Sequence, residues 1–127
     1  MKHLVAFTDS RIQKVLKGEL RFEVHFFRKR PEFLNKISVG DKVFIRKGSE
    51  VVAQFEIGKI ILFETLDRED FEIIRRFDSS LMKADFEQLL AKNKIALIVR
   101  IEKLEQLITS PVEVPYNLRK EWIVLEE

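Results

Sequence analysis

The clearest pattern in the chain is an alternation of apolar and polar residues from Leu20 to Phe27. A period of two over such a length predicts a β-strand with one row facing a core. The apolar row is expected to be buried and the second row to lie on an exposed face. Pro31 ends the strand, because proline cannot donate a hydrogen bond to a sheet ladder. The second row consists of Arg21, Glu23, His25 and Phe27.

Further apolar runs predict the other strands. They cover residues 3–7, 42–46, 51–63 and 95–101, and a closing strand lies within residues 121–127. Gly58 stands in the middle of the longest run, where it favours a bulge or a bend. The run at 95–101 is almost entirely apolar, which is typical of a central strand that is buried on both faces.

Three segments carry helix signals. Residues 8–18 begin with capping side chains and end at Gly18, and residues 83–93 form a short amphipathic segment. Residues 65–77 begin with acidic and end with basic side chains, which suits the helix dipole. The order of elements predicts a single α+β domain over residues 1–127. We expect a mixed β-barrel of about five to six strands with two to three covering helices.

The amino-acid composition excludes several kinds of functional site. The chain has 127 residues and no cysteine, so disulfides, thiolate metal sites and cysteine nucleophiles are excluded. The two histidines are far apart in the sequence, and we expect no metal and no cofactor. The first apolar run is too short for a signal peptide or a membrane span, which favours a cytoplasmic protein with no membrane partner. The charged composition is compatible with a thermophilic source, and a monomer is the default expectation.

Charge is distributed unevenly along the chain. The net charge is only +2, yet residues 11–47 hold eleven basic and four acidic side chains. Residues 48–127 hold eleven basic and sixteen acidic ones. A basic first third favours a polyanionic ligand on one side of the domain. The alternative is that these charges only solvate the surface.

Several motifs and their order along the chain resemble those of the ASCH domain family, a branch of the PUA-like superfamily. The family pattern is a helix ending in glycine, a strand written roughly G-x-K-x-x-E-x-R, a V-G-D turn and a hydrophobic hairpin. Gly18, Glu23 and the Val39-Gly40-Asp41 turn match it. The apolar run at 95–101 and the proline loop at 110–115 also stand where small ASCH proteins carry such segments. The resemblance covers most of the chain.

The resemblance implies a pseudobarrel with a cleft between the first helix and the following strand. Members bind RNA or modified nucleosides, and a few hydrolyse acetylated cytidine nucleosides or cut RNA. Leu20 stands where the hydrolytic members carry their lysine, and Glu23 stands where they carry a nearby threonine. His25 stands where the family motif has its arginine. An apolar Leu20 cannot activate water, so we expect binding rather than catalysis. The family's downstream carboxylate can correspond to Glu69, Asp70 or Glu72.

Three polar side chains of the strand at 20–27 are candidates for ligand binding. Arg21, Glu23 and His25 stand two residues apart, so they emerge on one face about 7 Å from one another. Arginine can hold phosphate or a base edge, a carboxylate can accept from an exocyclic amine, and a neutral imidazole can stack or carry a proton. The alternative is a solvated row with cross-strand ion pairs.

Basic residues around this strand would provide a positive field for a phosphate backbone. They are Lys17, Arg28, Lys29, Arg30 and Lys47.

Two aromatic residues have open roles. Phe27 can stack on a base, pack under the first helix or contact a second copy, and Trp122 can belong to the core or to a nucleobase cage.

The sequence therefore predicts a small domain that binds RNA or a nucleotide in the cleft by the first helix. The second hypothesis is a hydrolase of RNA or of a modified nucleoside, a ribonuclease or an amidohydrolase, with Glu23 and His25 as acid–base partners. The third is a protein-interaction domain that uses the acidic residues at 67–72. The ligand's identity, its base or modification, and the oligomeric state are left open.

Overall fold

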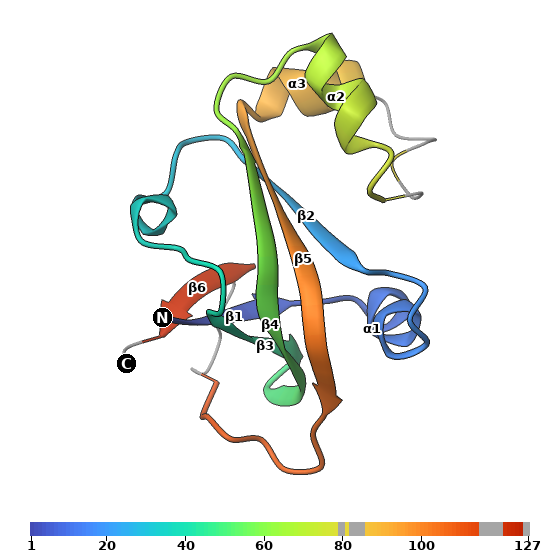
Figure 1. The fold of residues 1–127 in the computed structure, drawn as a ribbon, viewed down its shortest axis with the longest axis vertical. Coiled ribbons are helices and arrows are strands. Elements are labelled where there is room, and N and C mark those ends of the chain that lie inside the picture. The colour runs from blue at the N-terminus through green and yellow to red at the C-terminus, as the bar shows by residue number, and fades with distance from the viewer. Residues whose placement is uncertain (79–80, 82–85, 115–120, 126–127) are drawn as a thin grey trace.

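The computed structural model describes residues 1–78, 81, 86–114 and 121–125. Within them the chain forms one curled six-stranded sheet and three α-helices (Figure 1). The strands are β1 (Lys2–Ala6), β2 (Phe22–Phe27), β3 (Lys42–Lys47), β4 (Glu50–Phe63), β5 (Ile95–Gln106) and β6 (Trp122–Leu125). The helices are α1 (Asp9–Leu16), α2 (Arg68–Ile74) and α3 (Phe86–Lys92), with a 3-10 turn η1 (Glu32–Asn35) that was not predicted. The predicted α+β barrel with covering helices is confirmed.

The sheet has the order β2-β5-β4-β3-β1-β6. All neighbouring strands are antiparallel except β1 and β3, which run parallel. The long strands β4 and β5 lie side by side, and α2 and α3 lie together at one end of this pair (Figure 1). The ladder slips between Ile57 and Lys59, so Gly58 occupies the predicted bulge. None of the helices in the described part of the chain is long and apolar enough to span a membrane.

Helix α1 forms for the reasons that the sequence indicated. The Thr8 hydroxyl accepts a hydrogen bond from the Arg11 N–H at 3.3 Å and caps the first turn. Gly18 follows the helix with φ +75°, a left-handed conformation that favours glycine. Ile12 and Val15 are buried in the core inside the curl. This packing fixes the helix against the sheet and holds Arg11 next to β2.

Apolar side chains cover both faces of the sheet. The larger core fills the inside of the curl and includes Phe55, Leu97 and Trp122. On the other face, Ile74 of α2 packs in a second cluster with Val24 and Ile98. β5 is buried on both faces, as its apolar run predicted, because each row of its side chains enters one of these two clusters.

The exposed face predicted for β2 is wrong, although the strand and its alternation are confirmed. Glu23 is 5 % exposed, and His25 and Phe27 are only partly exposed. The curl of the sheet covers this row: α1 places Arg11 against Glu23, and β6 places Trp122 against the ring of His25. A period of two identifies a strand, but it does not reveal that both of its faces are covered.

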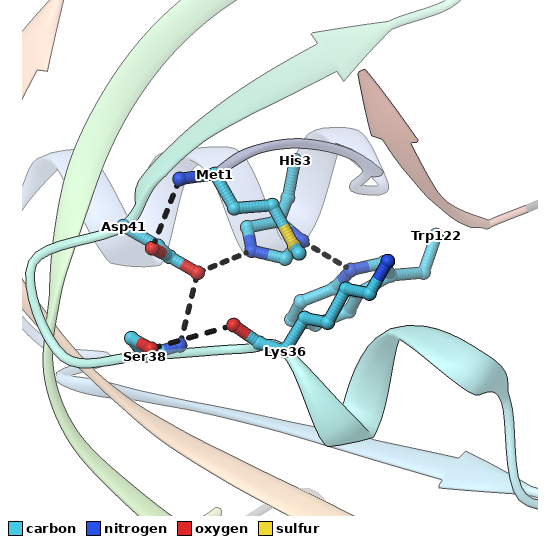
Figure 2. A network of polar contacts seen from close by, with 6 residues as sticks. All are labelled: Met1, His3, Lys36, Ser38, Asp41 and Trp122. Atoms are coloured by element: carbon cyan, nitrogen blue, oxygen red, sulfur yellow. Dashed lines mark hydrogen bonds and ion pairs between the residues drawn. The ribbon is translucent and has the colours of Figure 1, made fainter. Parts of the chain in front are cut away.

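A buried polar network joins β1, the V-G-D turn and β6 (Figure 2). The carboxylate of Asp41 accepts hydrogen bonds from His3 Nε2 and the Ser38 N–H, both at 3.0 Å, and forms an ion pair with the Met1 amino group at 3.2 Å. Trp122 Nε1 donates to His3 Nδ1 at 3.2 Å. Because an indole nitrogen only donates, Nδ1 of His3 carries no hydrogen and the imidazole is neutral. Trp122 is therefore a core residue that is held in place by His3.

This geometry makes the stability that His3 contributes dependent on pH. Burial lowers the pKa of His3, and the hydrogen bond to Asp41 offsets the effect only in part. A histidine with a lowered pKa stabilises the fold above its unfolded pKa of about 6.5, and this contribution is lost as the pH falls. We expect His3→Gln, which does not titrate, to reduce the melting temperature more at pH 7.5 than at pH 5.5. Fluorescence of Trp122, the single tryptophan, reports both melts; an equal reduction at the two pH values would contradict this account.

Candidate functional site

A cleft of about 380 Å³ opens between the edge of β2 and the ends of β1 and β6. Arg11 of α1 and Thr8 form one side, and Asn93, which follows α3, lies at another. Its lining residues are Ala6, Thr8, Arg11, Glu23, Val24, His25, Phe26, Asn93 and Glu121. The cleft therefore lies beside the first helix and the strand that follows it, and it collects side chains from four separate parts of the chain.

Arg11 connects three elements at this cleft. Its Nη2 donates to Glu23 Oε2 at 2.5 Å, and its Nη1 donates to Asp78 Oδ2 at 2.9 Å. Its guanidinium also lies over the ring of Phe7, 5.3 Å from the ring centroid. One cation thus serves two buried carboxylates, and it ties α1 to β2 and to the segment after α2.

Glu23 has the most perturbed acid–base behaviour at the cleft. Burial raises the pKa of Glu23 to about 7, although the charge and hydrogen bond of Arg11 act in the opposite direction and Asp78 adds a smaller increase. Near neutral pH this carboxyl can therefore donate or accept a proton. A side chain with this property in a cleft is suited to hydrogen-bond a ligand or to exchange a proton with one.

His25 lies two residues further along the same strand. Its Nε2 is 3.7 Å from Glu121 Oε2, and its ring lies 4.8 Å from that of Phe27 and 5.5 Å from that of Trp122. Burial lowers the pKa of His25, while the charge of Glu121 acts against this. The side chain is consequently held neutral between aromatic rings, and it can either accept or donate one hydrogen bond in the cleft.

The other predicted site residues lie outside this cleft. Arg21 precedes β2 and is exposed, and Lys17 is the exposed C-cap of α1. Arg28, Lys29 and Arg30 are exposed after the end of β2. Of these, Arg30 donates to Glu64 at 3.0 Å and to Asn35 at 2.5 Å, and Lys47 is 3.2 Å from Asp9. The structure thus brings Glu23 and His25 together and leaves the basic residues on the surface.

Arg11 was not identified as a site residue from the sequence, where it counted only towards the basic first third. Its partners lie 12 and 67 residues away, so no local motif links them. The useful signal would have been its place on α1: Arg11 precedes Ile12, which is buried, and so stands at the border of the buried stripe. Among the described residues, no group of three or more histidine, aspartate or glutamate side chains is placed to hold a metal ion.

A second, larger cavity of about 840 Å³ is lined by aromatic rings of β2, η1 and β6. Phe33 and Trp122 stack at 5.5 Å with an interplanar angle of 8°, and Phe27 meets Phe33 edge-on at 5.8 Å. These three rings line the cavity, and His25 touches Phe27 and Trp122 from the side of the cleft. Trp122 therefore belongs to the core and Phe27 packs against it, and both rings also line this cavity.

The buried carboxyl of Glu23 predicts a distinctive pH dependence of stability. Because its pKa is raised on folding, Glu23 favours the fold below its unfolded pKa of about 4.5, and this advantage is lost as the pH rises to about 7. We expect the free energy of unfolding of Glu23→Gln, taken relative to that of the wild type, to rise by about 3 kcal/mol between pH 4.5 and pH 8. Urea unfolding at the two pH values measures this difference. The matched control is Glu19→Gln at an exposed glutamate; a similar gain there would contradict an effect of burial.

Comparison with known proteins agrees with this architecture at the level of the fold. No protein-family model matches the chain, and no curated protein matches it. Among solved structures, a single-residue variant of the ASCH protein ZmASCH from Zymomonas mobilis superposes with a TM-score of 0.62 at 7 % identity, covering 99 % of this chain and 89 % of that one. The ASCH structure from the same organism gives 0.57 at 8 % identity, with coverages of 99 % and 88 %.

The chain is also similar to the hypothetical protein PH0355, with a TM-score of 0.50 and 16 % identity over 80 % of this chain and 98 % of that one. At these identities the likeness concerns the arrangement of helices and strands. The fold resemblance predicted from Gly18, Glu23 and the V-G-D turn is confirmed: the chain has the fold of the ASCH domain structures.

Proposed function

We propose that this domain binds RNA or a nucleotide in the cleft between α1 and β2. The observation that carries the proposal is the convergence of Arg11, Glu23 and His25 on one concave site in an ASCH-like fold. These groups provide a cation, a carboxyl that can carry a proton near neutral pH, and a neutral imidazole beside aromatic rings. Nucleobases combine a planar ring with donors and acceptors at its edge, so such a set suits them.

Part of the charge at the site is already neutralised within the protein. Arg11 is shared between Glu23 and Asp78, so its guanidinium is a poor candidate for an additional phosphate. Phosphate contacts in this proposal fall instead to the exposed residues 28–30, which follow the cleft strand directly. The cleft would hold the base, and the basic segment would hold the backbone that leads away from it.

Charge reversal tests the role of the basic segment. We expect Arg28→Glu, Lys29→Glu and Arg30→Glu together to weaken binding of single-stranded RNA and to reduce the slope of log K against log[salt] by up to about 2. A matched control reverses Lys59, Arg100 and Lys103, three exposed basic residues on β4 and β5 that line neither hollow. Unchanged affinity and slope in the first variant would remove the segment from the proposal.

A hydrolase is the second candidate, favoured by the pKa of about 7 at Glu23. A carboxyl with this pKa beside a neutral His25 is suited to general acid–base chemistry on RNA or a modified nucleoside. The position of the family's lysine argues against a direct transfer of mechanism, since Leu20 is 9 % exposed and belongs to the core.

Turnover assays distinguish this candidate from binding alone. If the domain is a hydrolase, Glu23→Gln should lower kcat by at least about 100-fold while the fold, monitored by circular dichroism, is retained. The activity of the wild type should depend on a group that titrates near pH 7. Absence of turnover by the wild type across a panel of RNAs and modified nucleosides would leave the binding proposal and reject the enzyme.

A further inference from the structure

The cleft is lined by four consecutive residues of β2, from Glu23 to Phe26. Side chains of a strand alternate between faces, so four side chains in a row cannot all enter one cleft. Val24 and Phe26 pack on the opposite face of the sheet, where Val24 joins the cluster around Ile74 and the Phe26 ring stacks on Phe71 at 6.5 Å. What these two residues present to the cleft is therefore their backbone.

The hydrogen-bond ladder supports this orientation. The Arg21 carbonyl accepts from the Ile101 N–H at 2.8 Å, and the Phe27 carbonyl accepts from the Lys94 N–H at 3.0 Å. In an antiparallel pair, residues that point their backbone groups towards the partner alternate with residues that point them away. The backbone N–H and C=O groups of the odd-numbered residues of β2 thus face β5. The backbone groups of residues 22, 24 and 26 point away from it.

No strand in the described part of the chain pairs with β2 on this outer side. The facing wall is formed by Ala6 and Thr8 at the end of β1 and by Glu121 before β6. This wall is itself tied together, since the Ala6 N–H donates to the Glu121 carbonyl at 2.9 Å. The cleft is therefore the open seam of the curled sheet, and one of its walls is a row of backbone donors and acceptors.

We propose that this seam reads the hydrogen-bonding edge of a nucleobase, with the Val24 carbonyl accepting from the base and the Phe26 N–H donating to it. The inference deepens the proposed nucleotide-binding function and rests on it. Every nucleobase has a donor next to an acceptor on its pairing edge, and the carbonyl of one strand residue lies beside the N–H of the residue two places on. The ladder to β5 fixes these groups in advance, so little ordering is needed on binding.

The neighbouring side chains would then select among bases. Glu23 and His25 project from the same stretch of β2, and each can donate or accept a hydrogen bond near neutral pH. An extended peptide is the other ligand that a free strand edge can take. The volume of about 380 Å³ and the walls at Arg11 and Glu121 favour a compact heterocycle over a strand that continues along β2.

Amide exchange measured by NMR tests this inference directly. In the free protein, the amide protons of Val24 and Phe26 should exchange quickly, while those of Glu23 and His25 should be protected by the ladder. Adding AMP, CMP, GMP and UMP in turn should slow exchange at Phe26 at least about tenfold with the base that binds best. A threonine–valine repeat peptide serves as the alternative ligand, and protection by the peptide that extends to Phe22 would overturn the nucleobase assignment.

A backbone substitution gives the matched control. Replacing Phe26 by its α-hydroxy acid analogue exchanges its N–H for an ester oxygen and keeps the side chain, and we expect it to weaken nucleotide binding about tenfold. The same replacement at Phe22, whose N–H also points away from β5 but which does not line the cleft, should leave binding unchanged. If nucleotides bind and the Phe26 ester has no effect, this inference fails and the proposed function stands. If the wild type binds neither nucleotides nor RNA, both fail.

Discussion

The double burial of β5 is the constraint on which the rest of this structure depends. Its residues from Ile95 to Val99 are at most 5 % exposed, so apolar layers must cover both faces of the sheet at this point. β2 pairs with β5 along its whole length and is drawn into both layers. Glu23 and His25 are consequently carried into the interior, where burial raises the pKa of Glu23 and lowers that of His25.

Arg11 limits how much this burial destabilises the fold. Glu23 and Asp78 share this guanidinium in a poorly solvated place, where burial favours a proton on Glu23. Burial is thus the main cause of the raised pKa of Glu23, and the charge of Asp78 adds a smaller increase. A ligand that donates a hydrogen bond at this point would take over the role of that proton, which links recognition at the cleft to the electrostatics of the core.

Much of the fold could be predicted from local patterns, and much of the site could not. The alternation in β2, the apolar run of β5, the cap at Thr8 and the bulge at Gly58 all have short-range causes, and all are observed. Contacts between distant segments determine the burial of Glu23 and its ion pair with Arg11. They also determine the hydrogen bond between Trp122 and His3. The basic residues after β2 were visible in the sequence, yet the structure leaves them exposed beyond the end of the strand, outside the lining of the cleft.

The placement of β1 has a consequence for how the chain folds. β1 pairs with β3, about 40 positions away in the sequence, and with β6, more than 115 positions away. In contrast, β3, β4 and β5 follow one another as antiparallel neighbours (Figure 1). Loop-closure entropy delays the pairing of such distant segments, so the antiparallel meander is expected to form first and β1 with β6 to dock last. His3 and Trp122 stand on these two late strands. We therefore expect their hydrogen bond to form in the final step of folding, when the curled sheet gains its last strands and the walls of its seam come together.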